Sequence, residues 1–96
     1  MTTLPEDIAA RIRHDFPAAA VESVVGLLAG LQREDPQLFG SRVLRCLVFL
    51  ARGQLTKLAE WVTLARTDYR DLIVAAEYDE NQQQVRDFNK PFNNVA

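Results

Sequence analysis

The sequence contains a single cysteine, Cys46, and a single histidine, His14. One cysteine cannot form an internal disulfide, whereas small secreted domains often carry an even set of cysteines. Structural zinc usually takes four cysteine or histidine ligands, and this chain has two such residues, far apart in the chain. The chain also lacks an EF-hand calcium loop, a phosphate-binding loop and a dinucleotide-binding glycine motif. We therefore expect no disulfide framework, no metal site and no cofactor.

Long apolar runs are also missing. The longest apolar-rich stretch, residues 18–31, is interrupted by Glu22 and Ser23 and is shorter than the roughly 20 residues that a bilayer-spanning helix needs. The first residues include Glu6 and Asp7 but no lysine or arginine ahead of an apolar segment, which does not fit a signal peptide. We expect no membrane contact and, by elimination, a cytoplasmic location.

The chain has no strong excess of charge of either sign. Its 11 basic and 13 acidic residues give a formal net charge of −2, and 48% of its 96 residues are hydrophobic. This composition is typical of one ordinary globular domain. A slightly negative chain does not suit a protein that binds by covering phosphates, so the composition argues against a nucleic-acid partner.

Apolar residues recur with helical spacing along most of the chain, which predicts an all-α fold of four to five short helices. The third of these, which we expect to be central, has a strand as its alternative, because Val43 and Val48 also suit a strand. Its leucines and the glycine that follows, Gly53, favour a helix. The predicted helices cover residues 5–15, 17–33, 41–52, 55–66 and 67–78.

Local chemistry marks several helix starts. Pro5 and Pro17 suit the first position of the first two helices, and Thr67 or Asp68 is expected to cap the last one. The residues of the last helix that we expect to face the core are Tyr69, Leu72, Ile73 and Ala76.

The composition changes after Glu80. Residues 81–96 are rich in asparagine and glutamine, and Pro91 prevents a long helix there. We therefore divide the chain into a helical domain, residues 1–80, and a non-regular polar arm, residues 81–96, with aromatic anchors. The arm is expected to lie either over the body of its own chain or over a partner.

Several apolar side chains lie off the predicted core stripes of the last two helices. A helix that is apolar on two sides is either centrally packed or offers a patch to a partner. Tryptophan and tyrosine are enriched in interfaces, so we expect a non-catalytic protein-interaction or regulatory module that binds a protein partner or a second copy of itself. The predicted partner-binding residues are Trp61, Leu64, Val74, Tyr78, Phe88 and Phe92. The alternative is that the arm covers these residues within one chain.

A second hypothesis is a helix-turn-helix DNA-binding regulator formed by residues 55–72. The pair Leu58 and Ala59 and the later Leu72 fall roughly where such a motif places its packing residues. However, residues 67–71 would begin the recognition helix with two acids and one arginine, which opposes contact with phosphates and base edges.

A third hypothesis is a small enzyme or an enzyme accessory subunit. Glu60 and Glu77 lie on adjacent predicted helices, where two carboxylates could pair, and His14 is the remaining candidate for acid–base chemistry. Cys46 lies within the most apolar helix, where a thiol is expected to be buried and inert. The sequence therefore predicts no catalytic residue.

Two further patterns leave alternatives open. Residues 42–57 carry four basic side chains and no acid, whereas residues 68–80 carry a net negative charge, so the two segments either face partners or pair with each other.

Gly26 and Gly30 lie inside the second predicted helix, where each glycine costs about 1 kcal/mol relative to alanine. The spacing predicts a neighbouring helix that crosses closely at these glycines.

Overall fold

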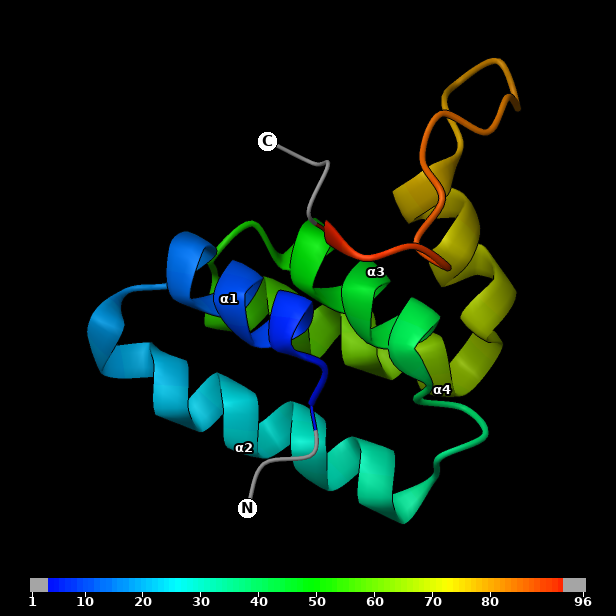
Figure 1. Ribbon diagram of the computed structural model, residues 1–96. Helices are drawn as coiled ribbons and strands as arrows, with labels where there is room; N and C mark the ends of the chain where they lie inside the picture. The colour runs from blue at the N-terminus through cyan, green and yellow to red at the C-terminus, as the bar shows by residue number, and fades with distance from the viewer. Residues whose placement is uncertain (1–3, 93–96) are drawn as a thin grey trace.

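The computed structural model describes residues 4–92 and contains four helices in that range (Figure 1). They are α1 (Glu6–Asp15), α2 (Ala18–Glu34), α3 (Ser41–Ala51) and α4 (Leu55–Glu77). The described residues form no strand, apart from an isolated antiparallel bridge between Tyr78 and Gln84. The all-α prediction is confirmed, and residues 43–51 are helical.

The helix ends follow the local chemistry of proline and glycine. Pro5 and Pro17 occupy the N-cap positions of α1 and α2, so each helix begins one residue later than predicted. Phe16 is extended, with φ −100° and ψ 151°, because the proline that follows disfavours helical geometry. Helix α3 ends where Arg52 and Gly53 both adopt positive φ. The cap chemistry read from the sequence therefore places these ends correctly to within about one residue.

The two helices predicted over residues 55–66 and 67–78 correspond to the two helical segments of α4, which meet at a kink at Asp68 (Figure 1). Asp68 has φ −156° and ψ 94°, outside the helical region, and its carboxylate accepts a hydrogen bond from the backbone N–H of Arg70 at 3.1 Å. That bond is the N-cap interaction expected of an aspartate that starts a helix. Asp68 thus caps the second segment as predicted, but the chain continues through the cap without a separate turn.

The core is centred on α3, in which every residue from Val43 to Val48 is buried. Helix α3 packs along α4 and also contacts α1, and α2 packs against α1 (Figure 1). Ile8 and Ile12 of α1 and Leu28 of α2 are fully buried, as the helical spacing predicts. The largest fully buried side chains come from all four helices and also include Phe88, which lies in the C-terminal arm.

The close helix crossing predicted at Gly26 and Gly30 is wrong. Among the described residues, no atom beyond the helix's own backbone and chain neighbours lies within 4 Å of where a Cβ would stand at either glycine. The helix-propensity cost of glycine is a local property, and it does not report which neighbour faces the residue. Neither glycine is therefore required by packing in the described fold.

We expect the replacement of Gly26 or Gly30 by alanine to raise the free energy of unfolding by up to about 1 kcal/mol each, because alanine is the better helix former and has room. Urea denaturation followed by circular dichroism measures this change. Gly53→Ala is the matched control of opposite sign, because Gly53 has φ +76° and an added Cβ would collide with the carbonyl oxygen of Asp15. Destabilisation by Gly26→Ala would show that α2 has a close neighbour at this position.

Among residues 4–92, none of the helices combines the length and the apolar character that crossing a bilayer requires.

Candidate functional site

The C-terminal arm turns back from the end of α4 and crosses α3 towards α1 (Figure 1). Asp79 organises the turn, since its carboxylate accepts hydrogen bonds from the backbone N–H groups of Asn81 and Gln83 at 2.8 and 3.1 Å. The backbone N–H of Val85 then donates to the carbonyl of Glu77 at 2.7 Å. An aspartate that bonds the backbone ahead of it is a common way to reverse the chain.

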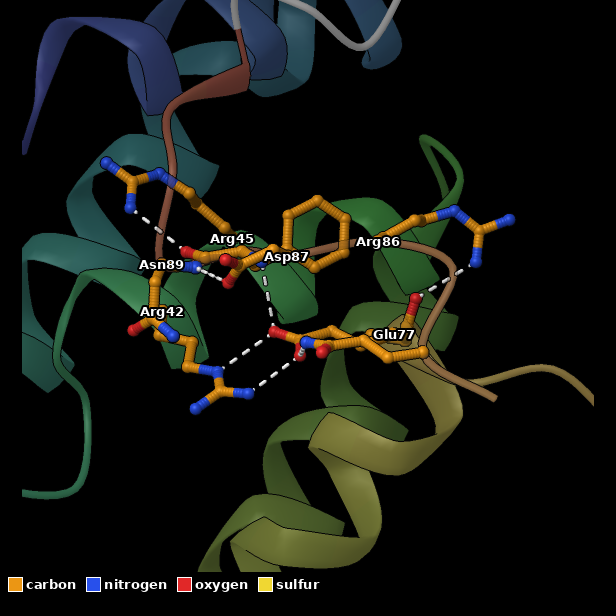
Figure 2. A network of polar contacts seen from close by, with 9 residues as sticks. Arg42, Arg45, Glu77, Arg86, Asp87 and Asn89 are labelled. Carbon is orange, nitrogen blue, oxygen red and sulfur yellow. Dashed lines mark hydrogen bonds and ion pairs between the residues drawn. The ribbon is translucent and has the colours of Figure 1, made fainter. Parts of the chain in front are cut away.

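Glu77 is the centre of a buried polar cluster that joins α3, α4 and the arm. Its side chain is fully buried and accepts two hydrogen bonds from the Arg42 guanidinium, at 2.7 and 2.9 Å (Figure 2). It also accepts from the Gln84 amide at 2.9 Å and from the backbone N–H of Phe88 at 3.0 Å. We call Glu77, Arg42, Gln84 and Phe88 the Glu77 cluster. Four donors for one carboxylate fit the rule that a buried charge must be paired and hydrogen-bonded.

The environment keeps this carboxylate ionised. Burial is the largest single effect and raises the pKa of Glu77, but the bonds from Arg42, Phe88 and Gln84 and the charge of Arg42 together bring the pKa below its usual 4.5. The bond to Glu77 in turn raises the pKa of Arg42. The pair is therefore fully charged at neutral pH and acts as a structural tie.

A second cluster fixes the far end of the arm to α1 and α3. Arg45, which is 7% exposed, donates to both carboxylate oxygens of Asp7 at 2.8 and 3.2 Å and to the carbonyl oxygen of Phe88 at 3.1 Å. Asp7 also accepts from the backbone N–H of Phe92 at 3.1 Å. The hydrogen bond from Arg45 is the main cause of the lowered pKa of Asp7. We call Asp7, Arg45 and these two backbone groups the Asp7 cluster.

Two aromatic anchors complete the attachment. Phe88 and Phe92 are 1% and 5% exposed, and the ring centroid of Phe88 lies 5.3 Å from that of Phe49 and 5.5 Å from that of Phe92. These tilted pairs are within the range of favourable aromatic contacts. The sequence left open whether the arm lies over the body of its own chain or over a partner. In the structure, the arm lies over its own chain within residues 81–92. Residues 93–96 lie outside the described part of the chain.

The other predicted partner-binding residues have a different environment. Trp61, Leu64 and Tyr78 are half-buried, the first two against the hydrophobic core, whereas Val74 is 45% exposed. The structure therefore does not bring the six predicted residues together on one surface. Phe88 and Phe92 are buried, whereas Trp61, Leu64 and Tyr78 are half-buried and Val74 is exposed.

An exposed apolar face lies on the second half of α4, after the bend at Asp68. Tyr69 was expected to point inward with Leu72 and Ala76, but it is 47% exposed, while the other two are buried. It lines an open groove with Ile73, together with residues of the loop before α3 and of α3 itself. The groove has a volume of about 470 Å³ and is lined by Asp35, Gln37, Leu38, Val43, Tyr69 and Ile73.

The groove has a sequence signal in retrospect. Tyr69 and Ile73 are four residues apart, so they share a helix side, whereas exposed Val74 lies on a different side of the helix. The position of Leu38 has no such signal, because its distance from α4 depends on the tertiary fold. We call Tyr69, Ile73, Leu38 and Val43, which line the groove, the α4 face.

The basic and acidic segments pair with each other in part. Arg42 binds Glu77, which is the alternative in which the two segments pair with each other. Arg45 instead binds Asp7 of α1. Arg52 remains exposed, with its guanidinium 5.6 Å from the centroid of the Phe49 ring, and Lys57 is also exposed. The basic stretch is therefore not one continuous patch on the surface.

The candidate acid–base residues are held apart or engaged elsewhere. Glu77 belongs to the buried cluster, Glu60 is exposed, and exposed His14 contacts Asp15 at 2.8 Å. Burial, followed by the negative charge of Glu77, raises the pKa of Cys46 to about 12, so this thiol is protonated at neutral pH. An open hollow of about 600 Å³ beside α1 includes His14, but Asp7 in its wall is tied to Arg45. The arrangement offers no nucleophile with an adjacent base within residues 4–92.

The segment compared with a helix-turn-helix motif has no turn where that motif needs one. Residues 63–67 are helical, and the bend falls at Asp68. The segment that follows begins with Asp68 and Asp71, which carry the wrong charge for the phosphate backbone.

No group of three or more histidine, cysteine, aspartate or glutamate side chains within the described range is placed to hold a metal ion. Comparison of the chain with protein-family models, with curated proteins and with solved structures finds no match. We therefore infer the function from the geometry of residues 4–92.

Proposed function

We propose that this chain is a non-catalytic, cytoplasmic protein-interaction module that forms a homodimer through the α4 face. The observation that carries the proposal is the 47% exposure of Tyr69 at the groove that it lines with Leu38 and Ile73. An exposed aromatic side chain at an apolar hollow is typical of interaction sites.

The arm leaves this surface uncovered in the described fold. Residues 86–92 attach to α1, α3 and the last turn of α4, through contacts that involve none of the α4 face residues. Exposed Asp35 and Gln37 line the groove together with its apolar residues, so an apolar centre has polar neighbours, as in a protein interface.

The α4 face suits a second copy of the same chain. In a twofold interface one patch meets itself, so it must contain both a projecting group and a recess. Exposed Tyr69 is the projecting group, and the groove that it lines with Val43 and Leu38 is the recess. Twofold dimers are the commonest symmetric oligomers, which supports this partner over others.

Sedimentation velocity over a range of protein concentrations tests the proposal. We expect the unmodified chain to convert from monomer to dimer as its concentration rises. The Tyr69→Ser variant is expected to weaken the dimer at least about tenfold, because central aromatic contacts contribute most of the binding energy in interfaces. The matched control is Leu55→Ser, which removes a similarly exposed side chain elsewhere and should leave the dissociation constant unchanged. A chain that stays monomeric up to its solubility limit contradicts the proposal.

A further inference from the structure

The body of the protein binds the arm largely through the arm's backbone. Glu77 accepts from the N–H of Phe88 at 3.0 Å, Arg45 donates to the carbonyl of Phe88 at 3.1 Å, and Asp7 accepts from the N–H of Phe92 at 3.1 Å. These three charged side chains come from α4, α3 and α1. Sites that bind extended peptides use this combination, in which main-chain bonds supply affinity and side-chain pockets supply selectivity.

The arm's requirements on its own sequence are correspondingly small. Asn89, Lys90 and Pro91, between the two anchors, are exposed, whereas the rings of Phe88 and Phe92 are buried. Phe88 contacts the Phe49 ring of α3. The guanidinium of Arg11, on α1, lies 5.0 Å from the centroid of the Phe92 ring. The backbone between them forms a turn, in which Asp87 accepts from the N–H groups of Asn89 and Lys90 at 3.0 and 3.1 Å. Arg86 adds a bond to the carbonyl of Ala76 at 3.1 Å, and its guanidinium lies 4.5 Å from the centroid of the Phe49 ring.

We propose that this cleft is a peptide-binding site for a segment in which two aromatic residues four positions apart flank a turn, and that residues 86–92 are its intramolecular ligand. We call the site the arm cleft and define it by Asp7, Arg11, Arg45, Phe49 and Glu77. It shares no residue with the α4 face, so it stands independently of the proposed dimer.

The connection between the arm and α4 allows such an exchange. Residues 80–87 are all exposed. The turn at the start of this connection, residues 79–84, is held by the Asp79 carboxylate and by the Tyr78–Gln84 bridge. A covalently attached ligand competes at a high effective concentration, in the millimolar range for a short flexible link. A segment of another molecule with the same chemistry therefore binds measurably once that link is cut or its anchors are weakened.

The test uses the full chain with a protease recognition sequence inserted between Gln82 and Gln83, cut after folding. A fluorescent synthetic peptide with the sequence of residues 84–92 is added, and its binding is followed by fluorescence anisotropy and size-exclusion chromatography. We expect the peptide to replace the cut arm while the helices remain folded by circular dichroism. A cut chain that unfolds, or one that keeps its arm without exchanging it, overturns the proposal.

Two control peptides define the recognition. With alanine at Phe88 and Phe92, binding is expected to fall at least about a hundredfold, because each buried ring is lost. With alanine at Asn89 and Lys90, binding is expected to stay within about threefold, since these side chains face solvent. Equal competition by both control peptides would contradict a site built on the two rings.

A second variant tests the same site without cutting the chain. Phe92→Leu keeps an apolar anchor but weakens the arm, so the labelled peptide should bind this intact variant at least about tenfold more tightly than it binds the unmodified chain. Equal binding to the two chains, with both folded, overturns the proposal.

Discussion

Replacing Phe88 by alanine is expected to lower the free energy of unfolding by about 3–5 kcal/mol. The Phe88 ring is 1% exposed and lies between the rings of Phe49 and Phe92, so its removal leaves a cavity at the junction of the arm and α3. Domains have total stabilities of only about 5–15 kcal/mol, so one arm residue controls a large share of this one's stability. Urea denaturation monitored by circular dichroism gives the value.

Val85→Ala is the matched control for this prediction. Val85 lies three residues earlier in the same arm and is 52% exposed, so its truncation should change the free energy of unfolding by less than about 0.5 kcal/mol. If Phe88→Ala were as mild as Val85→Ala, the arm would not be packed against the body as described.

Replacing Arg42 by methionine is expected to lower the free energy of unfolding by about 2–3 kcal/mol. The change keeps most of the apolar stem but leaves the fully buried Glu77 carboxylate without its cation. Breaking a wholly buried pair costs about 3–5 kcal/mol, and the effect here is smaller because the Arg42 side chain is 35% exposed. Arg33→Met, at an exposed position near the end of α2, serves as the control and should be nearly neutral.

The same variant is expected to change how stability depends on pH. The pKa of Glu77 is lowered in the folded chain, so its stabilisation is present above the unfolded value, near 4.5, and is lost as the pH falls through the folded value. Without Arg42 the folded pKa of Glu77 rises, and the decline of stability between neutral pH and about pH 3 becomes shallower. An unchanged acid dependence in Arg42→Met would show that Glu77 is not held ionised by Arg42.

The helices follow closely from the sequence because their signals are local. Apolar spacing, Pro17 and Gly53 are read within one or two turns of the chain, and they locate the ends of α1, α2 and α3. Asp68 was one of two candidate caps, with Thr67, and it is where α4 bends. The inward prediction holds for Leu72 and Ala76 and is wrong for Tyr69, which directly follows the bend at the start of that stripe.

The arrangement of the arm could not be read in the same way. The bond between Arg42 and Glu77 joins residues 35 positions apart, and that between Asp7 and Phe92 spans 85 positions. The sequence supplies the charges and the aromatic side chains, but an anchor for its own core and an anchor for a partner have the same residue types. Only the tertiary fold distinguishes them, and in residues 4–92 it directs Phe88 and Phe92 inward.

Native-state hydrogen exchange by NMR tests most directly whether the arm is part of the folded domain. The amide of Phe88 donates to Glu77 and that of Phe92 to Asp7, so both are expected to exchange far more slowly than the amides of exposed Asn81 and Asn89 in the same arm. Exchange of Phe88 and Phe92 as fast as that of Asn81 and Asn89 would contradict the attachment of the arm.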